Sequence, residues 1–154
     1  MAIPPHIELQ IATPDRPIVR EQVDEVQIPG AEGYFGVLPG HTPLLAALTV
    51  GELWYRKGQE KTPVSIAFGF AEVLPDRVTI LAKLAERADE IDPERAAAAL
   101  KRAEERLAHI AREIDYDRAR VALIKAITRL QVSSQARTGT RVGDLKRLRD
   151  TSRS

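Results

Sequence analysis

Residues 91–130, IDPERAAAALKRAEERLAHIAREIDYDRARVALIKAITRL, repeat apolar side chains with the period of an α-helix. In the first half, successive apolar residues are four, three, four, three and four positions apart, which places them on one helical stripe. This stripe consists of Ala96, Leu100, Ala103, Leu107, Ile110 and Ile114. A second stripe, with steps of four, three and four, consists of Ala119, Leu123, Ala126 and Leu130. Charged residues fill the other faces, so the stretch predicts two amphipathic helices.

Both predicted helices begin after an aspartate. Asp92 precedes Pro93, and Asp115 holds the matching position before the second stripe. An aspartate side chain accepts hydrogen bonds from the free N–H groups of the first helical turn, and proline suits that turn because it has no N–H to satisfy. A short link around residues 112–114 separates the stripes, so the helices are expected to form an antiparallel hairpin.

The packed stripes of this hairpin are rich in alanine. A buried alanine methyl contributes less than about 1 kcal/mol, whereas a buried leucine contributes about 1.5–3 kcal/mol. The hairpin is therefore expected to lean on the rest of the chain or on a partner, and to be able to leave that support.

The chain before residue 85 predicts short strands. Nine of the ten prolines and seven of the nine glycines lie within residues 1–75. Apolar and polar residues alternate at 7–11, 64–68 and 78–80, between turn residues. Such runs, recurring about every 8–12 residues, are typical of an antiparallel sandwich or barrel. Trp54 and the phenylalanines are expected to fill its small core.

Composition excludes several classes of protein. The chain has 154 residues, 44% of them hydrophobic and 29% charged, which indicates a globular protein. It has no cysteine, which excludes disulfides, thiolate metal sites and a cysteine nucleophile. No stretch approaches 18 apolar residues, so no membrane span is expected, and the N-terminus shows no export signal.

Charge is distributed unevenly along the chain. The formal net charge is +1, which argues against a nucleic-acid binder. Residues 1–85 carry a net −3, residues 86–135 a net 0 and residues 136–154 a net +4. We therefore expect a sandwich domain at 1–86, a helical hairpin at 87–133 and a basic, disordered tail at 134–154.

No catalytic residue and no metal site is predicted. Gly33, Gly36 and Gly40 lack the Gly-Lys-Ser/Thr of a phosphate-binding loop, so they are interpreted as turn residues. The three histidines are scattered without metal-ligand spacing, and the Gly-x-Ser-x-Gly pattern of a serine hydrolase is absent.

Five sequence blocks occur together in a fixed order. They are GYFGVLPGHTPLL at 33–45, FGFAEV at 68–73, VTILA at 78–82, AERA at 85–88 and IDPERA at 91–96. As a set, they resemble the epsilon subunits of bacterial F-type ATP synthases over about residues 5–132. The resemblance implies an N-terminal β-sandwich followed by a two-helix hairpin, the α+β fold of two segregated parts that the patterns indicate by themselves.

The resemblance also implies a function. Epsilon subunits lie at the foot of the central stalk, bind the gamma subunit and the c-ring, and turn with the rotor that couples proton flow to ATP synthesis. Their hairpin can extend into the alpha/beta catalytic hexamer and inhibit ATP hydrolysis. The chain is thus expected to be a non-catalytic regulatory subunit, peripheral on the cytoplasmic face of the cell membrane. A stand-alone ATP-sensing module is the alternative, and co-purification with gamma separates the two.

A regulatory ATP site is a further implication, although no cofactor is required. In some family members the folded hairpin binds ATP, and the matching positions here are Glu86, Ile91, Asp92, Arg95, Ala96, Arg102, Lys125 and Arg129. Lys125 stands where those members carry arginine, and lysine keeps the charge but loses the bidentate fork. The alternative is that Asp92 only caps a helix and the arginines are solvated.

Two further regions are candidates for contacts with other subunits. By resemblance, Glu32 and His41 lie toward the c-ring and gamma, although a lone histidine after a Pro-Gly turn is also a common structural residue. The basic tail is expected either to contact acidic surface inside the catalytic hexamer or to be a solvated extension.

Overall fold

The computed structural model describes residues 2–109 and 113–150. Its strands are β1 (Ile7–Ala12), β2 (Pro17–Val23), β3 (Glu25–Gly30), β4 (Gly33–Val37), β5 (Leu44–Lys57), β6 (Glu60–Val73) and β7 (Arg77–Arg87). Its helices are the short 3-10 helix η1 (Ala88–Glu90), α1 (Pro93–Ala108) and α2 (Glu113–Asp150). Strands come first and helices follow, which confirms the predicted α+β fold of two segregated parts.

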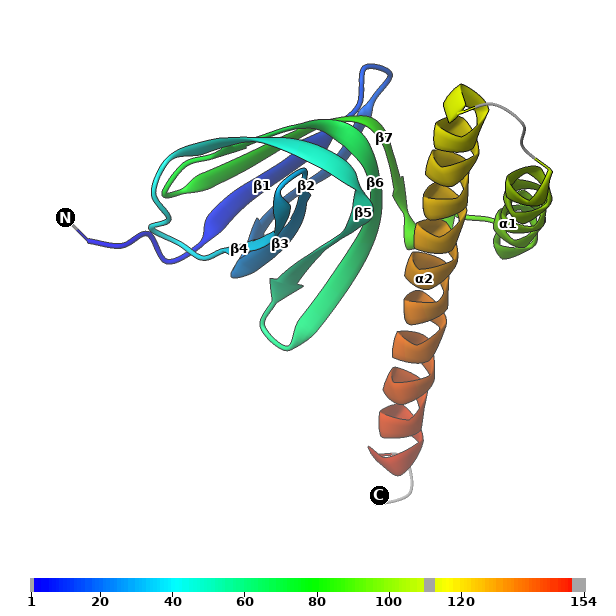
Figure 1. Cartoon of the computed structure of the whole chain (residues 1–154). Coiled ribbons are helices and arrows are strands. Elements are labelled where there is room, and N and C mark those ends of the chain that lie inside the picture. Colours follow the sequence, from blue (N-terminus) through cyan, green and yellow to red (C-terminus); the bar gives the residue numbers. More distant parts are fainter. Residues whose placement is uncertain (1, 110–112, 151–154) are drawn as a thin grey trace.

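The strands form one sheet in the order β2-β1-β7-β6-β5-β3-β4, which curves over on itself to enclose the core (Figure 1). Neighbouring strands are antiparallel except β1 and β7, which pair in parallel with Leu9 opposite Val78. This parallel pair departs from the predicted antiparallel sandwich. It is possible because β1 and β7 are separated by most of the sandwich, so no tight turn dictates their relative direction.

The core of the sandwich is aliphatic. Its largest fully buried side chains are Ile7, Leu9, Ile11, Ile28, Leu53, Ile66 and Ile80. The expectation that Trp54 and the phenylalanines fill the core is wrong. Leu53 and Tyr55 point inward, so Trp54 between them points outward by the alternation of a strand, while Phe35 only packs against the core from its margin.

Strand β6 contains a backbone distortion at Phe68 and Gly69, which have φ values of 60° and 122°. A Cβ atom on Gly69 would collide with the backbone carbonyl oxygen of Leu81 on β7, so only glycine fits this close approach. Phe68 is the single non-glycine residue with positive φ in the described chain. The distortion lies where β6 passes from the uncovered part of the sheet to the part beneath α2.

Helix α2 lies along the outer side of β5 and β6, and α1 packs on α2, farther from the sheet (Figure 1). The predicted stripes form the contact, because Ala103 of α1 and Ala119 and Ala126 of α2 are all buried. The hairpin thus leans on the sandwich, as its alanine content indicates.

Helix α2 begins earlier and ends later than the sequence predicts. It starts at Glu113, so Asp115 lies inside its first turn and is not the residue before the helix. Its backbone is helical to Asp150, so residues 134–150 of the predicted tail continue α2 in the described part of the chain. Residues 131–150 contain no proline, and two glycines at about 1 kcal/mol each do not stop a helix rich in arginine, lysine and leucine. Residues 110–112 and 151–154 lie outside the described residues.

In the described residues, no helix combines the length and the apolarity that crossing a membrane requires.

Candidate functional site

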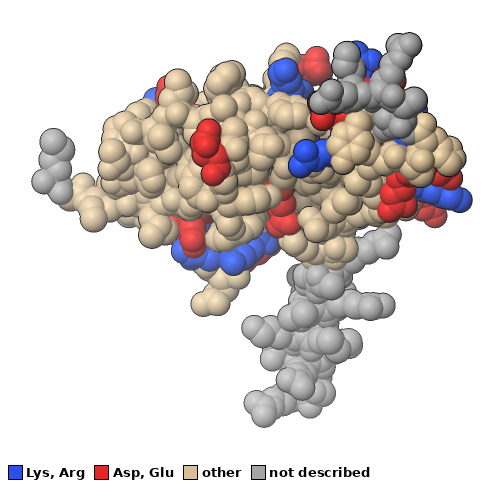
Figure 2. Space-filling view, viewed as in Figure 1, with Lys and Arg blue, Asp and Glu red and all other residues tan. Residues whose placement is uncertain are grey.

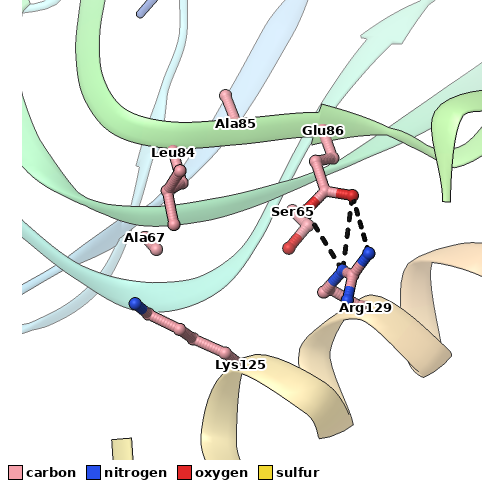
Figure 3. A pocket seen from close by; sticks show the side chains of 7 residues that line it. All are labelled: Ser65, Ala67, Leu84, Ala85, Glu86, Lys125 and Arg129. Atoms are coloured by element: carbon pink, nitrogen blue, oxygen red, sulfur yellow. Dashed lines mark hydrogen bonds and ion pairs between the residues drawn. The ribbon is translucent and has the colours of Figure 1, made fainter. Parts of the chain in front are cut away.

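Helix α2 and strands β6 and β7 enclose a small pocket (Figure 3). Its lining residues are Ser65, Ala67, Leu84, Ala85, Glu86, Lys125 and Arg129. Its volume is about 30 Å³, far below the roughly 300–1,000 Å³ of a small-molecule site. The pocket as it stands therefore holds water-sized occupants, although it carries three of the predicted ATP ligands.

Arg129 of α2 and Glu86 of β7 form the principal ion pair between helix and sheet (Figure 3). Arg129 Nε lies 3.1 Å from Glu86 Oε1, and Arg129 Nη2 donates to Glu86 Oε2 at 3.1 Å. The two side chains are 27% and 32% exposed, so the pair is partly shielded from solvent. A two-point, charge-assisted contact of this kind fixes the helix in both position and rotation.

Lys125 lies one turn before Arg129 and points toward the same strands (Figure 3). Its Nζ is 5.7 Å from the ring centroid of Phe68, and the Nζ of Lys83 on β7 is 6.0 Å from that centroid. Both distances fit a cation–π contact. Lys125 therefore helps to dock α2 on the distorted part of β6.

A second polar contact lies farther along α2. Gln135 Nε2 donates to Glu52 Oε2 on β5 at 3.0 Å. Burial raises the pKa of Glu52, and this hydrogen bond offsets part of the rise. Contacts at positions 125, 129 and 135 thus spread over almost three turns of the helix.

The start of α1 is fixed by Asp92. Its Oδ1 accepts hydrogen bonds from the backbone N–H groups of Glu94 at 3.0 Å and Arg95 at 3.3 Å. This confirms the predicted N-cap. Ile91 and Ala96 on either side are buried in a small cluster with Val132 of α2.

The other predicted ATP ligands lie apart from the pocket. Arg95 and Arg102 are exposed on α1, and neither makes an ion pair within the described part of the chain. The structure thus gathers Glu86, Lys125 and Arg129 and leaves the two α1 arginines exposed outside the pocket.

Glu32 and His41 occupy two turns of the sandwich, away from the α2 pocket. Glu32 is exposed between β3 and β4. His41 follows β4, its backbone N–H donates to the Leu38 carbonyl at 3.2 Å, and its Nδ1 lies 2.6 Å from the Thr42 carbonyl oxygen. His41 is therefore held by its own turn, and Glu32 is open to a partner.

Sequence reasoning missed an exposed apolar face on the sheet. Leu45 of β5, Phe70 of β6 and Leu81 of β7 are 72%, 60% and 59% exposed. Phe70 pairs directly with Leu81, and Leu45 pairs with Glu72, two residues from Phe70, so all three share one side of the sheet. We call these three residues the apolar face. The sequence signals were the adjacent apolar pairs Leu44-Leu45 and Ile80-Leu81, where alternation predicts one polar residue.

Charged side chains avoid much of the strand surface. Figure 2 shows a largely uncharged area over the strands, with charged groups gathered along its lower edge and around the helices. Within such an area, exposed large apolar side chains on neighbouring strands, such as Leu45, Phe70 and Leu81, are typical of a docking site.

A curved β-sandwich with a helical hairpin docked along its outer sheet is the architecture of the delta and epsilon chains of ATP synthases. The beta-sandwich domain model of the ATP synthase delta/epsilon chain matches residues 6–88, and the long alpha-helix domain model of that chain matches residues 89–134. The chain belongs to this family, as an epsilon subunit of the bacterial type.

Several relatives match this chain over most of its length. The ATP synthase epsilon chain of Solibacter usitatus is 56% identical over 102 residues, 66% of this chain and 76% of that one. The epsilon chain of Syntrophobacter fumaroxidans is 53% identical over 129 residues, 84% of this chain and 96% of that one. A chain in a cryo-EM structure of the Euglena gracilis mitochondrial ATP synthase, OSCP/F1/c-ring, has a TM-score of 0.74 at 30% identity, with 86% and 84% coverage. The chain is accordingly a subunit of the ATP synthase complex.

Proposed function

We propose that this chain is a non-catalytic rotor subunit that joins the gamma subunit to the c-ring at the cytoplasmic face of the membrane. The apolar face carries the proposal, because three large side chains on neighbouring strands remain uncovered while α2 packs on another part of β5 and β6. Burying a leucine or phenylalanine side chain contributes about 1.5–3 kcal/mol. A similar fold occurs at 13% identity in the central stalk and c-ring structure of the Tetrahymena thermophila ATP synthase.

We assign gamma to the apolar face and the c-ring to the turns of Glu32 and His41. The face is broad and apolar, which suits a stable contact inside the rotor. The two turns lie on loops and carry the titratable side chains Glu32 and His41, which suits a smaller contact with the ring.

The substitution Phe70→Asp tests the gamma contact. Placing a carboxylate at the centre of the apolar face should reduce co-purification with gamma at least tenfold, because the charge would have to be desolvated. Tyr116→Asp is the control, since Tyr116 is also a half-exposed aromatic residue but lies on α2. Equal retention of gamma by both variants would contradict the assignment.

We propose that the hairpin is an arm that inhibits ATP hydrolysis after its release from the sandwich and not while it is docked. Its contacts with the sandwich are alanine packing, one partly exposed ion pair and a few polar bonds, which a competing surface can replace. When released, the hairpin would reach the alpha/beta hexamer and block ATP hydrolysis. When docked, it would leave rotation free.

ATP is proposed as a regulatory ligand that acts between helix and sheet. Lys125 and Arg129 supply two cations for its phosphates, and Arg95 and Arg102 are exposed on the neighbouring helix. Arg129 would exchange Glu86 for a phosphate, and α2 would move outward, because the existing pocket is too small.

A further inference from the structure

The link between sandwich and hairpin is short and has two parts. Strand β7 ends at Arg87, η1 spans Ala88–Glu90, and α1 begins at Pro93. Between η1 and α1 only Ile91 and Asp92 are extended, with φ/ψ of −87°/122° and −82°/112°. Any movement of the hairpin has to be absorbed within this link.

An arginine from a distant turn reaches the first part of the link. Arg16, between β1 and β2, donates from Nη1 to Glu90 Oε1 at 2.7 Å, although 74 positions separate the two residues. The turn that carries Arg16 is itself closed, since the Thr13 N–H donates to the Arg16 carbonyl at 3.0 Å. The sandwich thus holds η1 by a contact that is independent of the helices.

Two local contacts complete this attachment. Glu90 Oε2 accepts from the backbone N–H of Arg87 at 3.0 Å, and Arg87 Nη2 donates to Asp89 Oδ2 at 2.6 Å. The hydrogen bond from Arg16 lowers the pKa of Glu90, and that from Arg87 lowers the pKa of Asp89, so both carboxylates remain ionised. We call Arg16, Arg87, Asp89 and Glu90 the hinge cluster.

Ile91, the first residue after η1, faces the hairpin and not the sandwich. Its side chain is buried against Ala96 of α1 and Val132 of α2, which both belong to the hairpin. Ala88 of η1 packs at the margin of the same cluster, so η1 touches both parts of the chain, and its polar attachment to the sandwich is supplied by Arg16 and Glu90.

We propose that the hinge cluster makes η1 a fixed part of the sandwich, so that the hairpin pivots on Ile91 and Asp92 alone. With the cluster intact, the flexible tether is two residues long. Without it, residues 88–92 are free and the tether is five residues long. The effective concentration of a tethered group falls as about the −3/2 power of tether length, so loss of the cluster should weaken docking about fourfold.

This inference rests on the proposed release of the hairpin, but the test measures opening in the isolated full chain and needs no inhibition. Hydrogen exchange at the amides of Arg87 and Ile91 reports on η1, because the Ile91 N–H donates to the Ala88 carbonyl. Spin labels at Gln59→Cys and Gln131→Cys report docking, and the chain has no other cysteine. Gln59 and Gln131 are both exposed.

Two variants should separate the effect of the hinge cluster from the effect of the Arg129–Glu86 ion pair. Arg129→Gln should increase the undocked fraction, while the amides of Arg87 and Ile91 stay as protected as in the unmodified chain. Arg16→Gln should make both amides exchange faster and raise the undocked fraction about fourfold, and Arg16→Lys should restore part of the protection. Arg20→Gln is the control, because Arg20 pairs with Glu8 on β1 and lies outside the hinge cluster.

Either of two results would overturn the inference. In the first, exchange at Arg87 and Ile91 rises in step with undocking in Arg129→Gln, which means that η1 leaves with the hairpin. In the second, Arg16→Gln leaves the hydrogen-exchange rates of both amides unchanged. Failure of the proposed function would appear elsewhere, as unchanged ATP hydrolysis in the assembled complex.

Discussion

Lys125 and Arg129 have different tasks although both are cations on one face of α2. Arg129 is engaged at two points by Glu86, so it can bind a phosphate only after giving up a carboxylate. Lys125 rests over the Phe68 ring, a weaker contact that a phosphate displaces more readily. Phosphate binding at this interface would therefore begin at Lys125.

Replacing Lys125 by arginine should strengthen ATP binding. A guanidinium keeps the cation–π contact and adds a second parallel hydrogen bond to phosphate. We expect the binding free energy to become more favourable by about 1 kcal/mol, which is about a fivefold lower Kd, in calorimetric titration of the full chain with ATP.

Lys101→Arg is the matched control for this experiment, because Lys101 is exposed on α1 and does not line the pocket. If neither variant binds ATP more tightly than the unmodified chain, Lys125 is not an ATP ligand. An equal gain in both would point to a general effect of guanidinium groups on the hairpin surface and not to a contact at position 125.

Some residues were predictable because their task is local. The Asp-Pro pair at 92–93 predicts an N-cap, and Asp92 makes the two bonds that a cap requires. Asp115 showed the same local pattern and failed, because α2 begins at Glu113. Phe68 was unpredictable, since its positive φ depends on the close passage of β7 at Gly69.

At the scale of elements, α2 shows what periodicity can and cannot predict. The stripe through Ala119 and Ala126 correctly predicted which face packs, because burial follows the 3.6-residue repeat. The end of the helix was not predictable from that repeat. Beyond Gln135 the sequence loses its apolar stripe but contains no proline to stop the backbone.

Deleting residues 136–154 should separate docking from inhibition. The hydrogen bond between Gln135 and Glu52 remains in the shortened chain, so docking measured by the spin labels should be unchanged. Inhibition of ATP hydrolysis in the assembled complex should weaken severalfold, because the proposed attraction between the net charge of +4 and acidic surface in the hexamer would be lost.

A charge-only variant provides the control for the deletion. Replacing Lys146, Arg147 and Arg149 with glutamine keeps the length of the helix and removes three positive charges. It should also weaken inhibition of ATP hydrolysis, and the loss of inhibition should be larger at low salt than at high salt. If the deletion leaves inhibition of ATP hydrolysis unchanged, the basic tail is a solvated extension.

At the scale of the whole molecule, the outer side of the sheet has two parts, one covered by a helix and one uncovered. Helix α2 covers one part of β5 and β6, and the apolar face lies on the other part of the same strands. The hairpin can dock or leave without covering Leu45, Phe70 or Leu81. A partner bound at the apolar face therefore need not be released when the hairpin moves.

This division could not be read from the sequence. Alternation predicted the inner side of each strand, as at Ile7, Leu9 and Ile11, because the core requires apolar residues there. It gave no reason for Phe70 and Leu81 on the outer side. Contacts between distant segments, such as Arg16 with Glu90, were equally hidden, because no local pattern encodes a partner 74 positions away.

The complete ATP synthase offers the decisive test of the inhibitory hairpin. Arg129→Gln removes the ion pair that holds α2 to β7. Since the two side chains are about one third exposed, loss of the pair should lower the free energy of docking by about 1 kcal/mol. The undocked fraction should then rise about fivefold. ATP hydrolysis by the assembled complex should fall accordingly, whereas deletion of residues 91–154 should raise it above the level of the unmodified complex.

Arg118→Gln is the matched control, because Arg118 is exposed on the same helix. Assembly of each variant is checked by co-purification with gamma, which we have assigned to the apolar face and not to the hairpin. If the deletion fails to increase hydrolysis while gamma is retained, the hairpin is not an inhibitor and the rotor role stands alone. If Arg129→Gln increases hydrolysis, the docked state inhibits, and the assignment of the two states has to be reversed.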